Sequence, residues 1–365
     1  MSGRFTIKDI NHRQIVRCML AAWIEQPGKP FVVKETDVPE VGRGDVLVEI
    51  KAASICGTDV HYWTGEFEPG KVPIIPGHEG AGIVREVGED VEHLKKGDHV
   101  IIHYVISCGN CIQCIQGYDN RCRFRRSIGH DVNGTFAQYI KIPARNALKV
   151  ADHVPFEWGT IMSCAVSTAY HALNVSGIKK GDTVVIFGVG GVGIHAVLWA
   201  KFFGAGKIIA VDLMDSKLEV AKEYGADLVI NPTREDVLEI IKKETDGWGA
   251  DIAIECSGSH KAMEQAIKAI KGKNIFESGK VISVGLQTKP FQIEYWGLRE
   301  GWITVSGDHT RFELQQIIKL VENGKIDLSK SVTHKIGLKE VNKGIELLKE
   351  GKEHVERIVI DMERG

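Results

Sequence analysis

The stretch Val184–Asp212, "VVIFGVGGVGIHAVLWAKFFGAGKIIAVD", decides the fold of one half of this chain. An apolar strand runs into Gly188-x-Gly190-x-x-Gly193, a helical segment follows, and a second apolar strand ends at the aspartate. In such a turn the first glycine permits a tight bend, the second lets the backbone approach a pyrophosphate, and the third allows the helix to pack closely on the strand. The helix N-terminus stabilises phosphate charge, so the stretch predicts a nucleotide site.

Asp212 indicates which nucleotide is expected. A carboxylate at the end of the second strand accepts hydrogen bonds from both hydroxyls of an adenosine ribose and repels a 2′-phosphate, so NAD is favoured over NADP. A glycine-rich turn alone is weak evidence, because such turns also occur for purely structural reasons. The strand before the turn, the helix after it and the acid at the second strand end favour the nucleotide interpretation.

Two patterns divide the chain. After the glycine-rich turn, apolar strands such as "DIAIECSG" and "KVISVGL" alternate with helical segments such as "EDVLEIIKKETD" and "KAMEQAIKAI". This alternation predicts a doubly wound parallel sheet with helices on both faces. From residue 17 to about 150, short strands such as "VLVEIKAASI" and "GAGIVREVG" are broken by Gly and Pro, which predicts a compact antiparallel β unit. Two helical stretches and a last strand, "RIVID", follow after about residue 306.

The composition limits the class of protein. At 365 residues the chain is too long for one ordinary core, so we expect two domains. Hydrophobic residues make up 43%, and the formal net charge of -2 gives no reason to expect a nucleic acid or a membrane as partner. No apolar run is long enough to span a bilayer. Residues 1–17 show no signal or transit pattern, so we expect a polar extension on a cytoplasmic protein.

The loop "SCGNCIQCIQGYDNRC" holds four of the eight cysteines: Cys108, Cys111, Cys114 and Cys122. The spacing C-x2-C-x2-C-x7-C can close a tetrahedral zinc shell without other ligands. With all four positions taken by protein, no place remains for water or substrate, so we expect a structural zinc site that staples the loop. The alternative is a set of free surface thiols, which would be exposed to oxidation.

The segments "ASICGTDVHYW", "IIPGHEGAGIVREVG" and "IMSCAVSTAYHAL" offer Cys56, His78 and Cys164. Taken singly, each is expected to be a buried thiol or a satisfied core histidine. Only a fold that brings them together would make a three-ligand zinc site with an open fourth position, which is the arrangement that catalysis needs. We interpret Cys18 and Cys256 as ordinary buried thiols.

These motifs together resemble a known family. "GHEGAGIVREVGEDV" matches the signature of the zinc-containing alcohol dehydrogenases, within the medium-chain dehydrogenase/reductase superfamily. The Cys56–Asp59 motif before it, the four-cysteine loop after it and the glycine-rich turn follow in that family's order. The similarity covers residues 18–365. It implies a GroES-like β-barrel catalytic domain, residues 1–165 and 307–365, with a Rossmann NAD-binding domain inserted at 166–306.

The resemblance also implies roles for single residues. It implies a catalytic zinc on Cys56, His78 and Cys164, with Glu79 near the metal, and a second, structural zinc on the four-cysteine loop. Asp59 would orient the histidine ligand, which fixes its tautomer. Thr58 and His61 would relay the proton of the alcohol to solvent. The implied cofactor contacts are Gly188, Gly190, Gly191, Val192, Gly193, Asp212, Lys217, Thr168 and Arg357.

The substrate is less well specified than the reaction class. Cys164 is the third ligand in classical alcohol dehydrogenases, whereas many polyol and threonine dehydrogenases have Glu there, which favours simple alcohols. Gly57 stands where some family members carry a basic residue on the pyrophosphate, so that contact would come from the backbone and Arg357. Trp63 and Tyr104 are expected to line the substrate pocket, although such aromatic residues also serve in barrel packing.

The segment "RCRFRRS" places Arg121, Arg123, Arg125 and Arg126 directly around the last loop cysteine. The simpler interpretation is a solvated face beside an anionic zinc–thiolate centre. The alternative is that one or two of these arginines bind a carboxylate or phosphate of the substrate.

The function that we predict is a zinc-dependent oxidoreductase that transfers a hydride between a primary or secondary alcohol and NAD, giving an aldehyde or ketone. The alternative is a polyol, sugar or cyclitol dehydrogenase on the same scaffold, possibly acting on an anionic substrate. A non-catalytic NAD-binding protein would be expected to lack zinc ligands or relay residues, and all of these are present. The resemblance implies a homodimer or homotetramer, and the partner is a small-molecule substrate.

Overall fold

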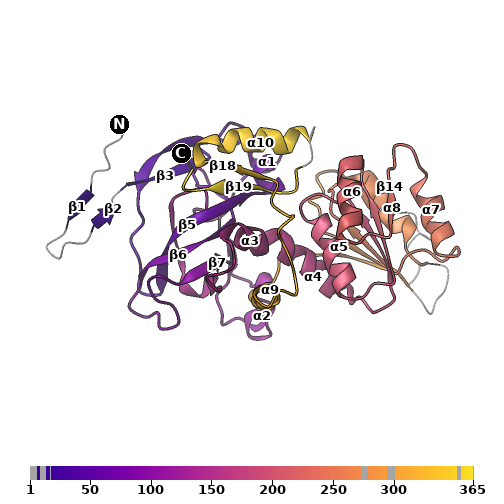
Figure 1. The fold of residues 1–365 in the computed structure, drawn as a ribbon, viewed down its shortest axis with the longest axis horizontal. Helices are drawn as coiled ribbons and strands as arrows, with labels where there is room; N and C mark the ends of the chain where they lie inside the picture. The colour runs from indigo at the N-terminus through magenta and orange to yellow at the C-terminus, as the bar shows by residue number, and fades with distance from the viewer. Residues whose placement is uncertain are drawn as a thin grey trace. The chain divides into compact units, whose positions relative to one another are not determined.

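The computed structural model describes residues 6–8, 14–16, 18–272, 278–293, 301–351 and 355–364. The chain forms two compact units (Figure 1). The first comprises Met1–Cys164 and Thr310–Gly365, and the second comprises Ala165–His309. The chain therefore builds most of the first unit, leaves to build the second, and returns to complete the first.

The first unit is mainly β-structure. Its strands are β1 (Thr6–Lys8), β2 (Gln14–Val16), β3 (Cys18–Trp23), β4 (Val32–Asp37), β5 (Asp45–Ile55), β6 (Glu79–Val87), β7 (His99–Ile102), β8 (Val105–Ile106), β9 (Arg126–Ser127), β10 (Tyr139–Pro143), β11 (Ala147–Lys149), β18 (His334–Ile336) and β19 (Ile358–Asp361). Its helices are α1 (Gly57–Thr64), α2 (Ile112–Ile115), α3 (Phe156–Ile161), α9 (Arg311–Glu322) and α10 (Val341–Glu350).

The main sheet of this unit has the strand order β11-β7-β6-β5-β19-β18, and β10 also pairs with β5. All pairs are antiparallel except β18 with β19. Long β5 is the centre of the sheet, and it ends at Ile55, directly before Cys56. Its neighbour β6 begins at Glu79, directly after His78, and Ser54 pairs with Glu79 in the ladder. Two of the three predicted zinc ligands therefore emerge at the same end of paired strands.

The second unit alternates strands and helices. Its strands are β12 (Thr183–Phe187), β13 (Lys207–Val211), β14 (Leu228–Ile230), β15 (Ile252–Glu255), β16 (Lys280–Ser283) and β17 (Trp302–Val305). Its helices are α4 (Ser167–Ser176), α5 (Gly193–Phe202), α6 (Asp215–Tyr224), α7 (Val237–Glu244) and α8 (His260–Ala269). The strands form one parallel sheet in the order β14-β13-β12-β15-β16-β17. The order reverses between β12 and β15, which is where open parallel sheets bind ligands.

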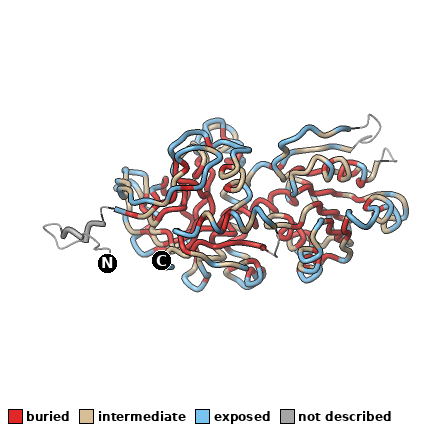
Figure 2. The backbone as a smooth tube through the Cα atoms, turned by 90° about the horizontal axis from the view of Figure 1, so that it is seen from above, coloured by how far each residue is buried: buried red, intermediate tan, exposed pale blue. Residues whose placement is uncertain are grey.

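Both faces of this parallel sheet are covered. Val185 and Phe187 of β12 lie in an apolar cluster with residues of α7 and α8. Their neighbours Val184 and Ile186 point to the opposite face because side chains alternate along a strand, and both are fully buried. Figure 2 shows the buried residues concentrated inside each unit and the exposed residues along its outer turns. The predicted doubly wound architecture is therefore confirmed.

Two expectations need correction. The polar extension at residues 1–17 contains a short antiparallel pair, β1 with β2, and its other residues lie outside the described part of the chain. Cys18, expected to be a buried thiol, is exposed because it begins the two-stranded β3–β4 ribbon, while Cys256 is partly buried. No helix in the described ranges is both long and apolar enough to cross a membrane.

Candidate metal centres and nucleotide site

The first unit gathers Cys56, His78, Glu79 and Cys164 into one cluster. Their candidate ligand atoms all lie within 4.8 Å of one another. His78, Glu79 and Cys164 are buried, while Cys56 is partly exposed as a whole residue. Cys56, His78 and Cys164 are far apart in the sequence, but the fold brings them together. Glu79, which the resemblance implied would lie near the metal, is in the same cluster.

Glycines let the chain deliver His78 to this cluster. Gly77 has a φ of +87°, a left-handed conformation that residues with a side chain rarely adopt. A Cβ added to it would come within 2.4 Å of the ring of Phe136. Farther along β6, a Cβ on Gly82 would lie 2.0 Å from the carbonyl oxygen of Glu49. The glycines of "GHEGAG" are therefore required by the turn into β6 and by its close pairing with β5.

Cys164 reaches the cluster from a different element. It lies in a π-helical turn, Met162–Val166, which follows α3. Ser163 beside it accepts a hydrogen bond from the backbone N–H of Gly80 in β6 at 3.3 Å. Gly159 of α3 lets the helix lie directly on the sheet, because a Cβ there would be 2.7 Å from the Cβ of Ala81. Single π turns within helices are frequent at functional sites, and this one sets the position of the third ligand.

Glu79 is tied to buried partners on two sides. Its Oε2 accepts a hydrogen bond from the Ser54 hydroxyl on the neighbouring strand. Its Oε1 lies 3.3 Å from Nη2 of Arg357, whose Nη1 donates to the carbonyl of Ile55 at 3.2 Å. Burial raises the pKa of Glu79, although the Arg357 guanidinium opposes the shift. The carboxylate is therefore held beside the ligands by a cation that comes from the last segment of the chain.

The donor groups of the cluster act on one another's pKa values. A hydrogen bond from Cys164 holds the pKa of Cys56 well below its usual range, and the same bond raises the pKa of Cys164. Burial would lower the pKa of His78, but its hydrogen bond to Cys56 and the thiolate charge raise it to about 9. Two sulfur atoms, one imidazole and one carboxylate form a donor set that suits zinc. The residues present therefore fit the predicted catalytic metal.

Asp59 has a structural contact that the sequence did not suggest. Its Oδ2 accepts a hydrogen bond from the backbone N–H of Cys56 at 2.9 Å, and this bond caps α1 and fixes the first ligand. Its Oδ1 is buried and has no hydrogen-bond partner within the described ranges. Burial raises the pKa of Asp59 to about 7, with the charge of His78 acting against the shift. The predicted role in orienting His78 stays a prediction.

The two predicted relay residues lie on α1. The hydroxyl oxygen of Thr58 is 4.0 Å from Sγ of Cys56. His61 lies one turn further along, is partly exposed, and its Nδ1 is 2.7 Å from Oε2 of Glu66. The pair therefore leads from the buried cluster towards the surface.

The two aromatic residues predicted for the pocket differ in their surroundings. The buried ring of Tyr104 lies edge-on to His78, with ring centroids 5.1 Å apart. The indole of Trp63 instead donates to Asn342 Oδ1 at 3.2 Å and lies under Lys349, both on α10. The contact with His78 indicates that Tyr104 lines the metal cluster. The contacts with α10 favour barrel packing as the role of Trp63.

The four-cysteine loop is gathered as its spacing predicts. The sulfur–sulfur distances are 4.0 Å for Cys108–Cys114, 3.5 Å for Cys111–Cys114, 3.8 Å for Cys111–Cys122 and 3.5 Å for Cys108–Cys122. Zinc–sulfur bonds of about 2.3 Å in a tetrahedron require sulfur atoms about 3.8 Å apart. The donor set and its spacing therefore fit a zinc ion with a closed shell.

The arginines around this loop lie on its surface. Arg121 and Arg123 are placed over the rings of Tyr118 and Phe124. Arg125 donates to the carbonyl of Asn120 and to the hydroxyl of Ser127. All four arginines of the segment are exposed. These partners favour the simpler interpretation, a solvated face of the zinc lobe.

In the second unit, the glycine-rich turn has the geometry that the motif predicts. Gly188 has a φ of +81°, and a Cβ on Gly193 would lie 1.8 Å from the carbonyl oxygen of Gly188. A Cβ on Gly190 would meet only the ammonium of Lys217, at 3.8 Å. The first and third glycines are thus required by the backbone, whereas the second leaves open space beside a cation. This space suits a pyrophosphate, which the helix N-terminus would also stabilise.

Asp212 stands at the end of β13 beside this turn. Its Oδ2 accepts from the backbone N–H of Val189 at 2.9 Å, and its Oδ1 accepts from Met214 at 3.0 Å. Gly191 and Val192 complete the turn before α5, and Thr168 is buried in α4. Arg357, predicted to touch the pyrophosphate, lies in the first unit beside Glu79, so that contact stays a prediction.

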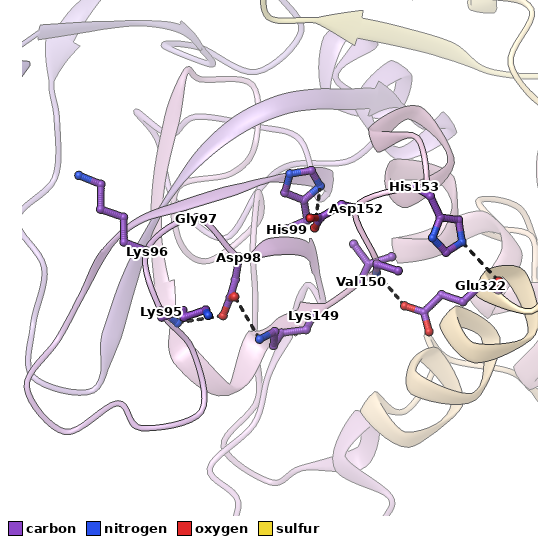
Figure 3. A pocket seen from close by; sticks show the side chains of 11 residues that line it. Lys95, Lys96, Gly97, Asp98, His99, Lys149, Val150, Asp152, His153 and Glu322 are labelled. Atoms are coloured by element: carbon purple, nitrogen blue, oxygen red, sulfur yellow. Dashed lines mark hydrogen bonds and ion pairs between the residues drawn. The ribbon is translucent and has the colours of Figure 1, made fainter.

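A surface hollow of the first unit lies on other elements. It is lined by Lys95, Lys96, Gly97, Asp98, His99, Lys149, Val150, Ala151, Asp152, His153 and Glu322 (Figure 3). Several of its polar groups already have partners: Asp98 pairs with Lys149 at 3.0 Å, and Glu322 accepts from the backbone N–H of Ala151. We assign no function to it.

Three supporting residues could not be recognised from the sequence. The hydroxyl of Ser54 donates to the carboxylate of Glu79, and the hydroxyl of Ser163 accepts the backbone N–H of Gly80 in β6. The hydroxyl of Thr135 donates to the backbone carbonyl of Glu79 at 3.0 Å. None of them lies in a motif that predicts chemistry. Ser54 could be identified only once the register of β5 on β6 was known.

Comparisons with known proteins agree with this geometry. Residues 42–152 match the alcohol dehydrogenase GroES-like domain, and residues 191–323 match the zinc-binding dehydrogenase domain. An alcohol dehydrogenase of Geobacillus stearothermophilus is 39% identical over 84% of this chain and 90% of its own length. An L-threonine 3-dehydrogenase of Pyrococcus horikoshii is 34% identical over 92% of this chain and 96% of its own. A Sinorhizobium meliloti structure, described as a zinc-binding dehydrogenase bound to NADP, superposes with a TM-score of 0.85 at 30% identity, covering 94% of this chain and 99% of that one.

Proposed function

This chain belongs to the zinc-containing alcohol dehydrogenase family of the medium-chain dehydrogenase/reductase superfamily, and we propose that it transfers a hydride between an alcohol and NAD. It is an oxidoreductase of the alcohol dehydrogenase type. The finer proposal is oxidation of a primary or secondary alcohol to an aldehyde or ketone. The observation that carries it is the convergence of Cys56, His78 and Cys164 with Glu79 in the first unit.

The protein's own groups have distinct tasks in this proposal. Cys56, His78 and Cys164 would hold the catalytic zinc, which when bound supplies Lewis acidity towards a substrate oxygen. Glu79, anchored by Arg357, would hold negative charge beside the ligands. The Thr58 hydroxyl would accept the proton of the alcohol as it gives up its own, and partly exposed His61 would release a proton to solvent. Tyr104 would keep water from the buried side of His78.

The substrate is tested by NADH formation with a panel of simple alcohols, polyols, cyclitols, amino alcohols and phosphorylated alcohols. We expect the highest kcat/KM with a simple primary or secondary alcohol. Activity confined to polyhydroxylated or amino alcohols would overturn this assignment. It would favour the second candidate, a polyol or threonine-type dehydrogenase, which the L-threonine 3-dehydrogenase relatives support. Activity confined to anionic substrates would make Arg123, Arg125 and Arg126 the residues to replace.

We propose NAD as the cofactor because the Asp212 carboxylate stands at the end of β13 beside the glycine-rich turn, held by the backbone N–H groups of Val189 and Met214, and a carboxylate at this position of such folds would repel a 2′-phosphate. The Asp212→Asn variant is expected to lower the ratio of kcat/KM for NAD over NADP by about tenfold to a hundredfold, which corresponds to about 1.4 to 2.8 kcal/mol. The change should appear mainly in KM for the two cofactors.

The matched control for this change is Asp182→Asn. Asp182 directly precedes β12, so it lies where the strands of this sheet begin, whereas Asp212 lies where they end. Like Asp212, it accepts a backbone N–H with its carboxylate. This control should leave the ratio unchanged. A wild-type enzyme that prefers NADP, as bound in the Sinorhizobium meliloti relative, would refute the proposal.

We also propose a cytoplasmic homodimer or homotetramer. The strand β17 ends the described parallel sheet and pairs only with β16, and Val305 on it is 73% exposed. An exposed sheet edge of this kind is a template for pairing with a second copy. Sedimentation analysis should give a mass of two or four chains, and a monomer at micromolar concentration would contradict the proposal.

A further inference from the structure

A buried carboxylate in the second unit has no place in the mechanism above. Glu255 is the last residue of β15, at the side of the sheet where the C-terminal ends of the parallel strands lie, and it is fully buried. A buried carboxylate is costly unless its oxygens are hydrogen-bonded, so its partners indicate why it is there. Burial raises the pKa of Glu255, but hydrogen bonds from its neighbours oppose this shift and favour the ionised form.

The partners of Glu255 come from two separate loops. From the loop after β15, its Oε1 accepts the backbone N–H groups of Ser257 at 2.7 Å and Gly258 at 3.1 Å, and also the Ser257 hydroxyl. From the loop after β16, Gln287 donates its side-chain amide to Oε2 at 2.6 Å. One carboxylate, which can only accept, thus binds donors from both loops.

These two loops lie against the glycine-rich turn. A Cβ added to Gly188 would meet the Cβ of Ser257 at 2.7 Å and its backbone nitrogen at 2.9 Å. A Cβ on Gly285 would meet the backbone nitrogen of Gly258 at 2.1 Å. The turn and both loops are therefore in backbone contact, and a displaced Ser257 would displace the turn.

We propose that Glu255 is a positioning residue for the nicotinamide half of the cofactor, acting through loops 256–259 and 284–288. The inference rests on the proposed dinucleotide function. In a doubly wound sheet the two halves of a dinucleotide bind on either side of the point where the strand order reverses. Asp212 at the end of β13 marks the adenosine side, so the loops after β15 and β16 are on the nicotinamide side.

The test compares a whole dinucleotide with its adenosine half. Dissociation constants are measured for NADH by fluorescence and for AMP by calorimetry, on the full chain and on the Glu255→Gln and Gln287→Ala variants. In Glu255→Gln one of the two acceptor oxygens becomes a donor NH2 group, so one of the two loops loses its acceptor. We expect NADH binding to weaken about tenfold while AMP binding changes less than about twofold. Gln287→Ala removes a single donor, and a loss of about threefold is expected.

The control variant is Glu219→Gln, which changes an exposed glutamate of α6 in the same unit. It should alter neither constant. An equal loss of NADH and AMP binding in Glu255→Gln would show a general structural role and overturn the proposal, as would unchanged NADH binding. If Glu255→Gln does not fold, Gln287→Ala decides by the same comparison. Wild-type protein that binds neither NADH nor NADPH would instead refute the proposed function itself.

Discussion

The Cys164→Ala variant is expected to lose at least about 10³-fold in kcat/KM, because a metal that polarises an alcohol oxygen contributes several kcal/mol to the transition state. Cys164 is buried and within 4.8 Å of the donor atoms of Cys56, His78 and Glu79. Removing its sulfur leaves two of the three predicted zinc ligands. The zinc content should therefore fall from two ions to one per chain.

Further readouts separate this effect from misfolding. The glycine-rich turn belongs to the other compact unit, so NADH should bind to Cys164→Ala as it binds to the wild type. The Tm should fall only as expected for one truncated buried side chain. Cys18→Ser serves as the control, because Cys18 is exposed and outside both cysteine clusters. A variant that keeps its full zinc content, or that retains activity within about tenfold of the wild type, would contradict the assignment.

The parts of the site that depend on short spacing could be predicted from the sequence. The four-cysteine loop and the glycine-rich turn each lie within one continuous segment, so residue type and interval already determine which atoms meet. The structure agrees with both: the sulfur atoms are 3.5–4.0 Å apart, and Gly190 leaves space beside Lys217. Local chain geometry is sufficient for such sites.

The parts of the site that depend on topology could not be predicted in this way. Cys56 and His78 meet because β5 pairs with β6, and Cys164 joins them through a π-helical turn. Arg357 reaches Glu79 because β19, which follows it, pairs with β5. Only the family resemblance suggested that these residues belong together, and it gave no sign of the bonds made by Ser54 or by Asp59. A hydroxyl on a strand carries no signal of its own until the register is known.

The second large effect is expected at the four-cysteine loop. The Cys111→Ala variant should lower the Tm by about 10 °C, since a loss of about 4 kcal/mol shifts the Tm of a chain of this size by this order. The loop has little else to hold it. Its helix α2 has four residues, none of them buried, and isolated helices of this length are not stable in water. Ile112 and Ile115 on it are 59% and 70% exposed, so apolar burial contributes little.

The other contacts of the four-cysteine loop indicate which parts of the first unit should lose stability in Cys111→Ala. Asp119, near its end, accepts the backbone N–H of Arg311 at 3.0 Å, and its Oδ2 lies 3.4 Å from Nε2 of His103. These contacts connect the loop to the start of α9 and to the residue that directly follows β7. A loosened loop should therefore reduce the stability of the first unit while leaving the cluster of Cys56, His78 and Cys164 assembled at low temperature.

The two cysteine variants should consequently show opposite results. At 10 °C, Cys111→Ala should contain one zinc ion and keep kcat/KM within about fivefold of the wild type, because a closed zinc shell has no open position for substrate. Cys164→Ala should also contain one zinc ion, but its Tm should fall less than that of Cys111→Ala while its activity is lost. A Cys111→Ala protein that is inactive yet as stable as the wild type would place chemistry at the loop, and the division of roles between the two clusters would be wrong.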